Sequence, residues 1–219
     1  MKVCLDPGHG GRDPGACVAG VSEAGINLSV ARLTAGRLRD ARCETLLTRE
    51  IDVYRSLGDR AAEANDWGAD LFLSIHCNWA VSDAASGFEV WTSRGDTGAD
   101  WFATLLFTTL QGEFPSSPAR ADYGDGDPDK ERDLTVLVRT GMPAVLIELG
   151  FLSNSSERAA LRNVDIQDRF AAALARGVLL GVGGPETGGP GAVCEARHAR
   201  LLEQLRVISG QLSGLLREF

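Results

Sequence analysis

Apolar runs alternate with helical patterns from residue 2 to about residue 180, and this alternation predicts strands and helices in turn. Compact apolar runs predict strands at 2–5, 43–48, 69–75, 88–91 and 144–149. Apolar positions spaced three and four residues apart predict helices at 22–41, 54–67, 101–110 and 166–180. The run at 69–75 is apolar throughout, which is typical of a central strand covered on both faces. The predicted fold class is therefore α/β, with a largely parallel sheet flanked by helices.

The pattern changes after residue 180. Residues 181–191 are rich in glycine and proline and predict a linker. In 192–219, apolar side chains recur at alternating steps of four and three, as along a coiled-coil seam: Cys194, His198, Leu201, Leu205, Ile208, Leu212, Leu215 and Phe219. We therefore expect a folded domain over 1–180, a linker over 181–191, and a C-terminal amphipathic helix that forms a homo-oligomer or docks onto a globular surface. Self-association is favoured because the linker detaches the helix from the domain.

Three predicted strands end at a side chain that can bind a metal or carry a proton. The first strand breaks into a glycine-rich turn that holds His9, the strand at 69–75 runs into His76, and the strand at 144–149 contains Glu148. Open α/β sheets place their sites at the carboxyl ends of strands. We therefore expect these three side chains to converge.

The two imidazoles, together with Glu23 at the start of the first predicted helix, offer the ligands of a catalytic zinc site. Two histidines and a carboxylate leave a fourth position open to water, and zinc lowers the pKa of a bound water from ~15.7 toward ~7. Taken alone, Glu23 is better explained as a carboxylate that complements the helix dipole, and only the two histidines favour the metal site. Amide hydrolysis also needs a proton carrier, and Glu148 is the candidate because an acid beside a buried strand is costly unless it has a partner. The pattern predicts a zinc hydrolase.

Four stretches together resemble one family: DPGHGGRDPGA, SEAGINLSVA, LFLSIHCN and PAVLIELGFLSN. They are similar to the zinc-dependent N-acetylmuramoyl-L-alanine amidases of bacterial cell division and of phage endolysins. The resemblance covers residues 2 to about 180 and implies a mostly parallel, roughly six-stranded sheet. It implies that His9, Glu23 and His76 bind Zn²⁺ and that Glu148 is the catalytic acid/base. The implied reaction cuts peptidoglycan at the amide between the lactyl group of N-acetylmuramic acid and L-alanine of the stem peptide.

Arg49 and Arg60 also match the family pattern, which implies either structural or substrate-orienting roles. Division amidases of this branch carry a long inserted regulatory helix and a wall-targeting domain. Only the polar segment at 112–132, which predicts a surface loop, leaves room for an insertion, and no wall-binding module is recognisable. The chain therefore resembles an endolysin more than a division enzyme.

Two rival functions stay open. One is a zinc peptidase or carboxypeptidase that cuts within the stem peptide. The other is a non-catalytic wall-binding module that uses zinc structurally.

The charge of the chain and the length of its apolar runs indicate which partners to exclude and where the protein acts. The net charge is −8, the isoelectric point is about 4.9, and no basic cluster occurs, so neither nucleic acid nor an anionic membrane is expected as a partner. No apolar run approaches the ~20 residues that a membrane span needs. The chain enters its first strand directly after Met1, so we expect synthesis in the cytoplasm and action on the wall after release, unless a leader is missing from this sequence.

The acidic run within 112–132 resembles a calcium loop in its spacing. Counted from Asp122, however, the twelfth position is Asp133 rather than glutamate, and glycine occupies the third and fifth positions rather than the sixth. This linear motif therefore does not predict a calcium loop.

Overall fold

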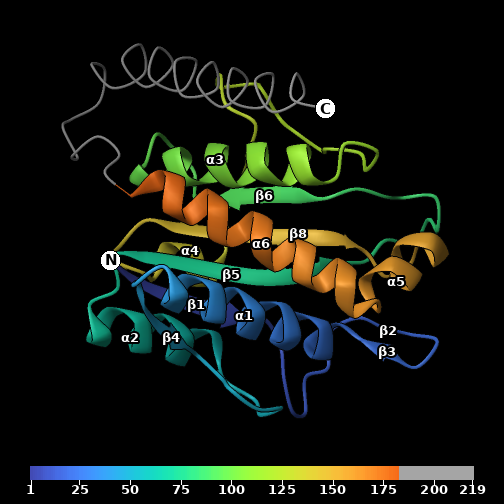
Figure 1. Cartoon of the computed structure of the whole chain (residues 1–219), viewed down its shortest axis with the longest axis horizontal. Coiled ribbons are helices and arrows are strands. Elements are labelled where there is room, and N and C mark those ends of the chain that lie inside the picture. The colour runs from blue at the N-terminus through green and yellow to red at the C-terminus, as the bar shows by residue number, and fades with distance from the viewer. Residues whose placement is uncertain (183–219) are drawn as a thin grey trace, which may run out of the picture. The chain divides into compact units, whose positions relative to one another are not determined.

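A six-stranded sheet forms the centre of the computed structural model, which describes residues 1–182 (Figure 1). In spatial order its strands are β4 (Glu44–Leu47), β1 (Lys2–Pro7), β5 (Leu71–Asn78), β8 (Ala144–Phe151), β6 (Glu89–Thr92) and β7 (Lys130–Glu131). The first four of these run parallel, whereas β6 is antiparallel to β8. The predicted mostly parallel, six-stranded sheet is confirmed.

Helices cover both faces of the sheet. The longer ones, α1 (Glu23–Asp40), α3 (Gly98–Glu113) and α6 (Val164–Gly181), pack against one another on one face (Figure 1). The other face carries α2 (Leu57–Trp67) and the short α4 (Thr135–Val138). Alternate residues of β5 enter the two cores: Leu71, Leu73 and Ile75 face the first, and Phe72 faces the second. This burial on both faces explains why the strand is apolar throughout.

The start of α1 is held by the turn before it rather than by a serine cap. Ser22 occupies the cap position, but its side chain makes no capping hydrogen bond. The amides of Glu23 and Ala24 instead donate to the carbonyls of Ala16 and Pro14. The glycine-rich turn therefore satisfies the free amides that a serine cap would otherwise take.

Several short elements had no counterpart in the sequence prediction. A small hairpin of β2 (Cys17–Val18) and β3 (Val21–Ser22) lies inside the first turn, and α5 (Ser155–Leu161) follows β8. The expected loop at 112–132 ends in β7, while residues 114–129 contain no helix. Elements this short have no hydrophobic period from which to predict them.

The predicted tail is outside the described residues from Gly183 onward, which covers most of the linker and the whole heptad-bearing segment at 192–219. The linker, the coiled-coil seam and the oligomer therefore stay predictions. None of the helices in residues 1–182 is both long enough and apolar enough to cross a membrane.

Candidate metal centre and active site

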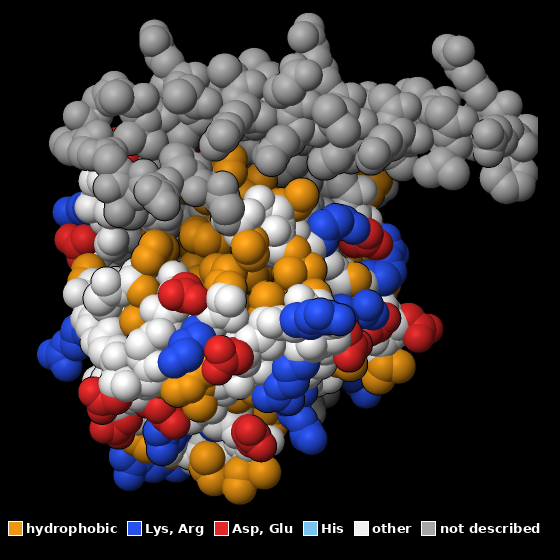
Figure 2. All heavy atoms as spheres, turned by 60° about the vertical axis from the view of Figure 1, so that its left-hand side comes forward, with side chains coloured by type: hydrophobic (Ala, Val, Ile, Leu, Met, Phe, Trp, Pro, Cys, Tyr) orange, Lys and Arg blue, Asp and Glu red, His pale blue; other side chains and the backbone are white. Residues whose placement is uncertain are grey.

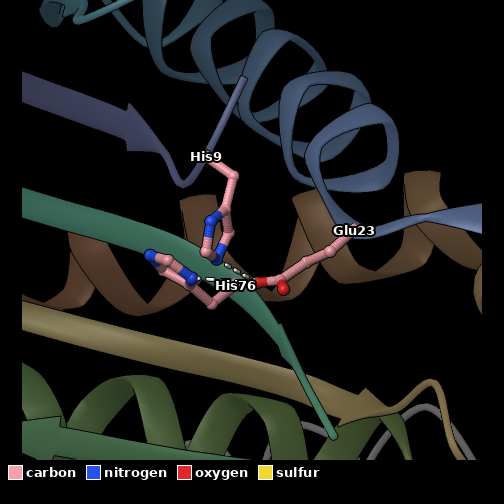
Figure 3. Close-up of side chains that lie close together, drawn as sticks. All are labelled: His9, Glu23 and His76. Atoms are coloured by element: carbon pink, nitrogen blue, oxygen red, sulfur yellow. Dashed lines mark hydrogen bonds and ion pairs between the residues drawn. The ribbon is translucent and has the colours of Figure 1, made fainter. Parts of the chain in front are cut away.

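Two histidines and one glutamate converge at the carboxyl ends of β1 and β5 (Figure 3). His9 comes from the turn after β1, Glu23 is the first residue of α1, and His76 lies on β5. The Oε1 atom of Glu23 lies 2.9 Å from Nδ1 of His76 and 3.2 Å from Nε2 of His9. One ligand atom from each residue lies within 4.8 Å of the others. Figure 2 brings forward the left-hand side of Figure 1, where the parallel strands β1, β5 and β8 begin, and no histidine side chain is visible on that face.

Glycines make this close approach possible. A Cβ atom on Gly8 would lie 2.1 Å from the ring of His76, and one on Gly15 would lie 2.4 Å from Oε2 of Glu23. His9 itself adopts a left-handed backbone conformation with φ of 62°. The glycine-rich turn thus allows the ring of one histidine to lie directly against the backbone that carries the other.

Glu23 is the electrostatic centre of the cluster. The side chain is buried, and its oxygens accept hydrogen bonds from the amides of Ala16 (2.9 Å) and Cys77 (3.1 Å). Burial alone would raise the pKa of Glu23, but hydrogen bonds and charge from His76 and His9 lower it well below its ordinary value. The carboxylate is therefore ionised at neutral pH and favours positive charge beside it.

Asp13 and Asn27 hold His9 and Glu23 in place, and the sequence analysis missed both. Asp13 Oδ2 lies 2.9 Å from Nδ1 of His9, so it orients the ring and leaves Nε2 facing Glu23. The Asn27 amide donates to Oε1 of Glu23 at 3.3 Å and to the carbonyl of Gly8 at 3.2 Å. One signal was present, because Asn27 lies four residues after Glu23, on the same side of a helix.

Glu148 lies beside the cluster because β5 and β8 pair with His76 opposite Glu148. It is half-buried, and within residues 1–182 its buried Oε2 atom has no hydrogen-bond partner. Burial, together with the negative charges of Glu23 and Glu89, raises the pKa of Glu148 well above its ordinary value. A carboxyl group with a raised pKa can hold a proton near neutral pH, as a general acid must.

Glu89 lies on the next strand, so that His76, Glu148 and Glu89 occupy facing positions on three neighbouring strands. The sequence analysis did not predict Glu89. In the antiparallel pairing of β6 with β8, Glu89 lies opposite Glu148. Its buried carboxylate forms ion pairs with Arg120 and, at 3.0 Å, with Lys130. Trp91 also donates to it, through Nε1 at 3.2 Å. The position depends on the register of a four-residue strand, which the hydrophobic pattern does not specify.

Arg49 and Arg60 are buried beneath the turn that carries His9. Arg49 donates to the carbonyls of Pro7, Gly8 and Ala24. Arg60 donates to the carbonyls of Pro7 and His9 and pairs with the carboxylate of Asp6 at 2.7 Å. These contacts give both arginines a structural function. The predicted contact with substrate stays a prediction.

The four predicted site residues line one open cavity of about 520 Å³, which also exposes Trp79. Its size suits a ligand larger than a single small molecule fragment. The ionised carboxylate and two imidazoles offer donors that suit Zn²⁺, and Glu148, whose pKa is raised by burial and neighbouring negative charges, lines the same space. This arrangement can support metal-assisted hydrolysis.

Comparison with known proteins agrees with this chemistry. A family model described as N-acetylmuramoyl-L-alanine amidase matches residues 3–179. The sporulation-specific N-acetylmuramoyl-L-alanine amidase of Bacillus subtilis (strain 168) is 37% identical over 179 residues, which cover 81% of this chain and 65% of the relative. The endolysin of Bacillus phage SPP1 is 35% identical over 184 residues, which cover 80% of this chain and 64% of the endolysin.

The fold comparison gives the same result. The crystal structure of N-acetylmuramoyl-L-alanine amidase from Clostridium difficile 630 has a TM-score of 0.78 at 33% identity, covering 84% of this chain and 98% of that chain. The chain spans slightly less than two thirds of the length of the sporulation amidase and of the endolysin. With a family model matched over residues 3–179, the chain belongs to the N-acetylmuramoyl-L-alanine amidase family.

Proposed function

We propose that the chain hydrolyses peptidoglycan at the amide that joins the lactyl group of N-acetylmuramic acid to L-alanine of the stem peptide. One observation carries the proposal: two imidazoles, an ionised carboxylate and a carboxyl group with a raised pKa line a single cavity in the part of the chain that matches the family.

We also propose that His9, Glu23 and His76 hold Zn²⁺. The two nitrogens and one oxygen are ligand types that zinc favours, and their spread of 4.8 Å or less suits one ion. The partner of His9, Asp13, is a carboxylate, as is common for metal-binding histidines. Bound zinc would supply a Lewis acid that polarises the lactyl carbonyl and makes water nucleophilic at neutral pH.

Glu148 moves the proton in this proposal. As the C–O bond forms, the carboxylate takes a proton from the attacking water, and it then donates that proton to the departing nitrogen of L-alanine as the C–N bond breaks. Such a group works best when its pKa lies near the working pH. Burial and the neighbouring carboxylates shift the pKa of Glu148 in that direction.

Mass spectrometry of digested wall fragments tests the reaction. We expect free L-alanine amino termini and intact glycan strands bearing unsubstituted lactyl groups. New termini within the stem peptide would instead identify a zinc peptidase. Binding to pelleted walls without release of amino groups would identify a wall-binding module.

We further propose that the chain acts on the cell wall after release from the cell that makes it, in the manner of an endolysin. Its similarity to a phage endolysin over 184 residues supports this setting. Fractionation of producing cells, with the protein followed before and after lysis, would test it. Export before lysis would contradict it.

A further inference from the structure

A second group of carboxylates lies outside the cavity described above. Asp100 belongs to the first turn of α3, while Asp127 and Asp129 precede β7. One oxygen from each of the three lies within 4.8 Å of the others. The chain therefore brings together acids that are 27 to 29 residues apart in sequence.

Two of these acids are buried without a compensating positive charge. Asp129 is only 2% exposed and Asp100 only 8%. Within residues 1–182, no lysine, arginine or histidine forms an ion pair with any of the three. Burying uncompensated charge is costly, so such a group must bind a proton or a cation. Burial and neighbouring acids raise the pKa of Asp129 to about 9 and that of Asp100 to about 7.

The hydrogen bonds of Asp129 leave one oxygen without a donor. Its Oδ2 atom accepts from the hydroxyl of Thr92 at 2.6 Å. Its Oδ1 atom is buried, and within residues 1–182 it has no hydrogen-bond partner apart from a proton that Asp129 can share with the neighbouring carboxyl group of Asp127. A bound cation could take the place of that shared proton.

We propose that Asp100, Asp127 and Asp129 bind a divalent cation, for which Ca²⁺ is the best fit. All three ligands are carboxylates, which suit hard cations, and the cluster lacks the imidazole and thiolate donors that favour zinc. Two Ca–O bonds of ~2.3–2.6 Å span about 5 Å, which matches the spread of the ligand atoms. The linear spacing counted from Asp122 could not indicate this cluster, because Asp100 comes from a different part of the chain.

The cation would join three elements at the edge of the sheet. It would link the start of α3 to the segment before β7, and Asp129 already bonds to Thr92 at the end of β6. The next residue, Lys130, pairs with Glu89. Bound cation would therefore fix the segment that delivers this lysine to the carboxylate facing Glu148.

Calcium titration of the full chain tests the proposal, with the chain used as isolated and any Zn²⁺ bound at His9, Glu23 and His76 left in place. We expect saturable binding by calorimetry and a rise in melting temperature with Ca²⁺. We also expect terbium luminescence sensitised by Trp101, which follows Asp100 in sequence, or by Trp91, which pairs with Lys130, the residue after Asp129. Asp129→Asn should weaken Ca²⁺ binding at least tenfold, and Asp127→Asn, at a half-buried position, should do the same.

Asp122→Asn is the matched control, because Asp122 is an exposed acid of the same segment outside the cluster. It should bind Ca²⁺ like the unmodified chain. Absence of binding in the millimolar range, or equal loss in Asp122→Asn and Asp127→Asn, would overturn the proposal. If Asp129→Asn fails to fold, Asp127→Asn decides the outcome.

Discussion

At the scale of single residues, Glu148 can be separated from the proposed zinc site, because His9, Glu23 and His76 are held by contacts with one another. Glu148→Ala should leave zinc content near one ion per chain and lower peptidoglycan hydrolysis by about 10²–10⁴-fold, because the proton carrier is lost. Metal analysis and release of amino groups from purified walls measure the two effects.

His76→Ala is the counterpart of that variant. Only His9 and Glu23 would then face the ion, so both the metal and the activity should be lost. Hydrolysis near the original rate by Glu148→Ala, or stoichiometric zinc in His76→Ala, would contradict these assignments.

Glu89 should act on the reaction through Glu148 rather than on the substrate. Its negative charge raises the pKa of Glu148, so Glu89→Gln should lower that pKa. The limb of the pH–rate profile of kcat/KM that reports Glu148 should move to lower pH. Glu131→Gln, an exposed acid of β7, is the control and should leave the limb in place. An unchanged profile in Glu89→Gln would exclude this electrostatic effect.

At the scale of elements, buried polar and charged side chains hold the turn after β1 in place. Asp6 is 1% exposed and accepts hydrogen bonds from Thr48 and Ser74 in addition to Arg60. A sequence pattern could indicate that the strand ends near His9. It could not show that two arginines hold that end from below, because they come from later elements.

Arg60→Ala should lower the free energy of unfolding by about 3–5 kcal/mol, because the Asp6 carboxylate would remain buried without its cation. Urea unfolding at neutral pH measures the loss. Arg55→Ala is the control, since Arg55 pairs with Glu63 at the surface and should cost less than about 1 kcal/mol. Equal losses in the two variants would contradict a special function for the buried pair.

Side chains at strand ends can be predicted from sequence, whereas neighbours that depend on strand register or helix packing cannot. His9, His76 and Glu148 could be predicted because each ends or interrupts an apolar run, and carboxyl ends of parallel strands share an edge. Glu89 and Asp100 could not, because their neighbours depend on the register of β6 and on the packing of α3. Local periodicity carries no information about either.

At the scale of the whole molecule, the residues beyond 182 stay a matter of prediction. If the heptad seam of 192–219 is intermolecular, replacing both Leu205 and Leu212 with Asp should convert an oligomer into a monomer, because buried charge disrupts such a seam. Mass measurement of the intact assembly is the readout. Replacing the off-seam residues Gln204 and Gln211 with Asp is the control. An assembly mass that does not change in the leucine variant would exclude this seam.

The order of the site residues along the chain has a consequence for biosynthesis. The three residues proposed to hold Zn²⁺ lie within the first 76 residues, whereas Glu148 lies on a strand that is synthesised much later. If the proposed roles hold, a ribosome releases the residues that bind the ion before the residue that moves the proton. Until β8 pairs with β5, a nascent chain would then lack the acid that amide hydrolysis needs.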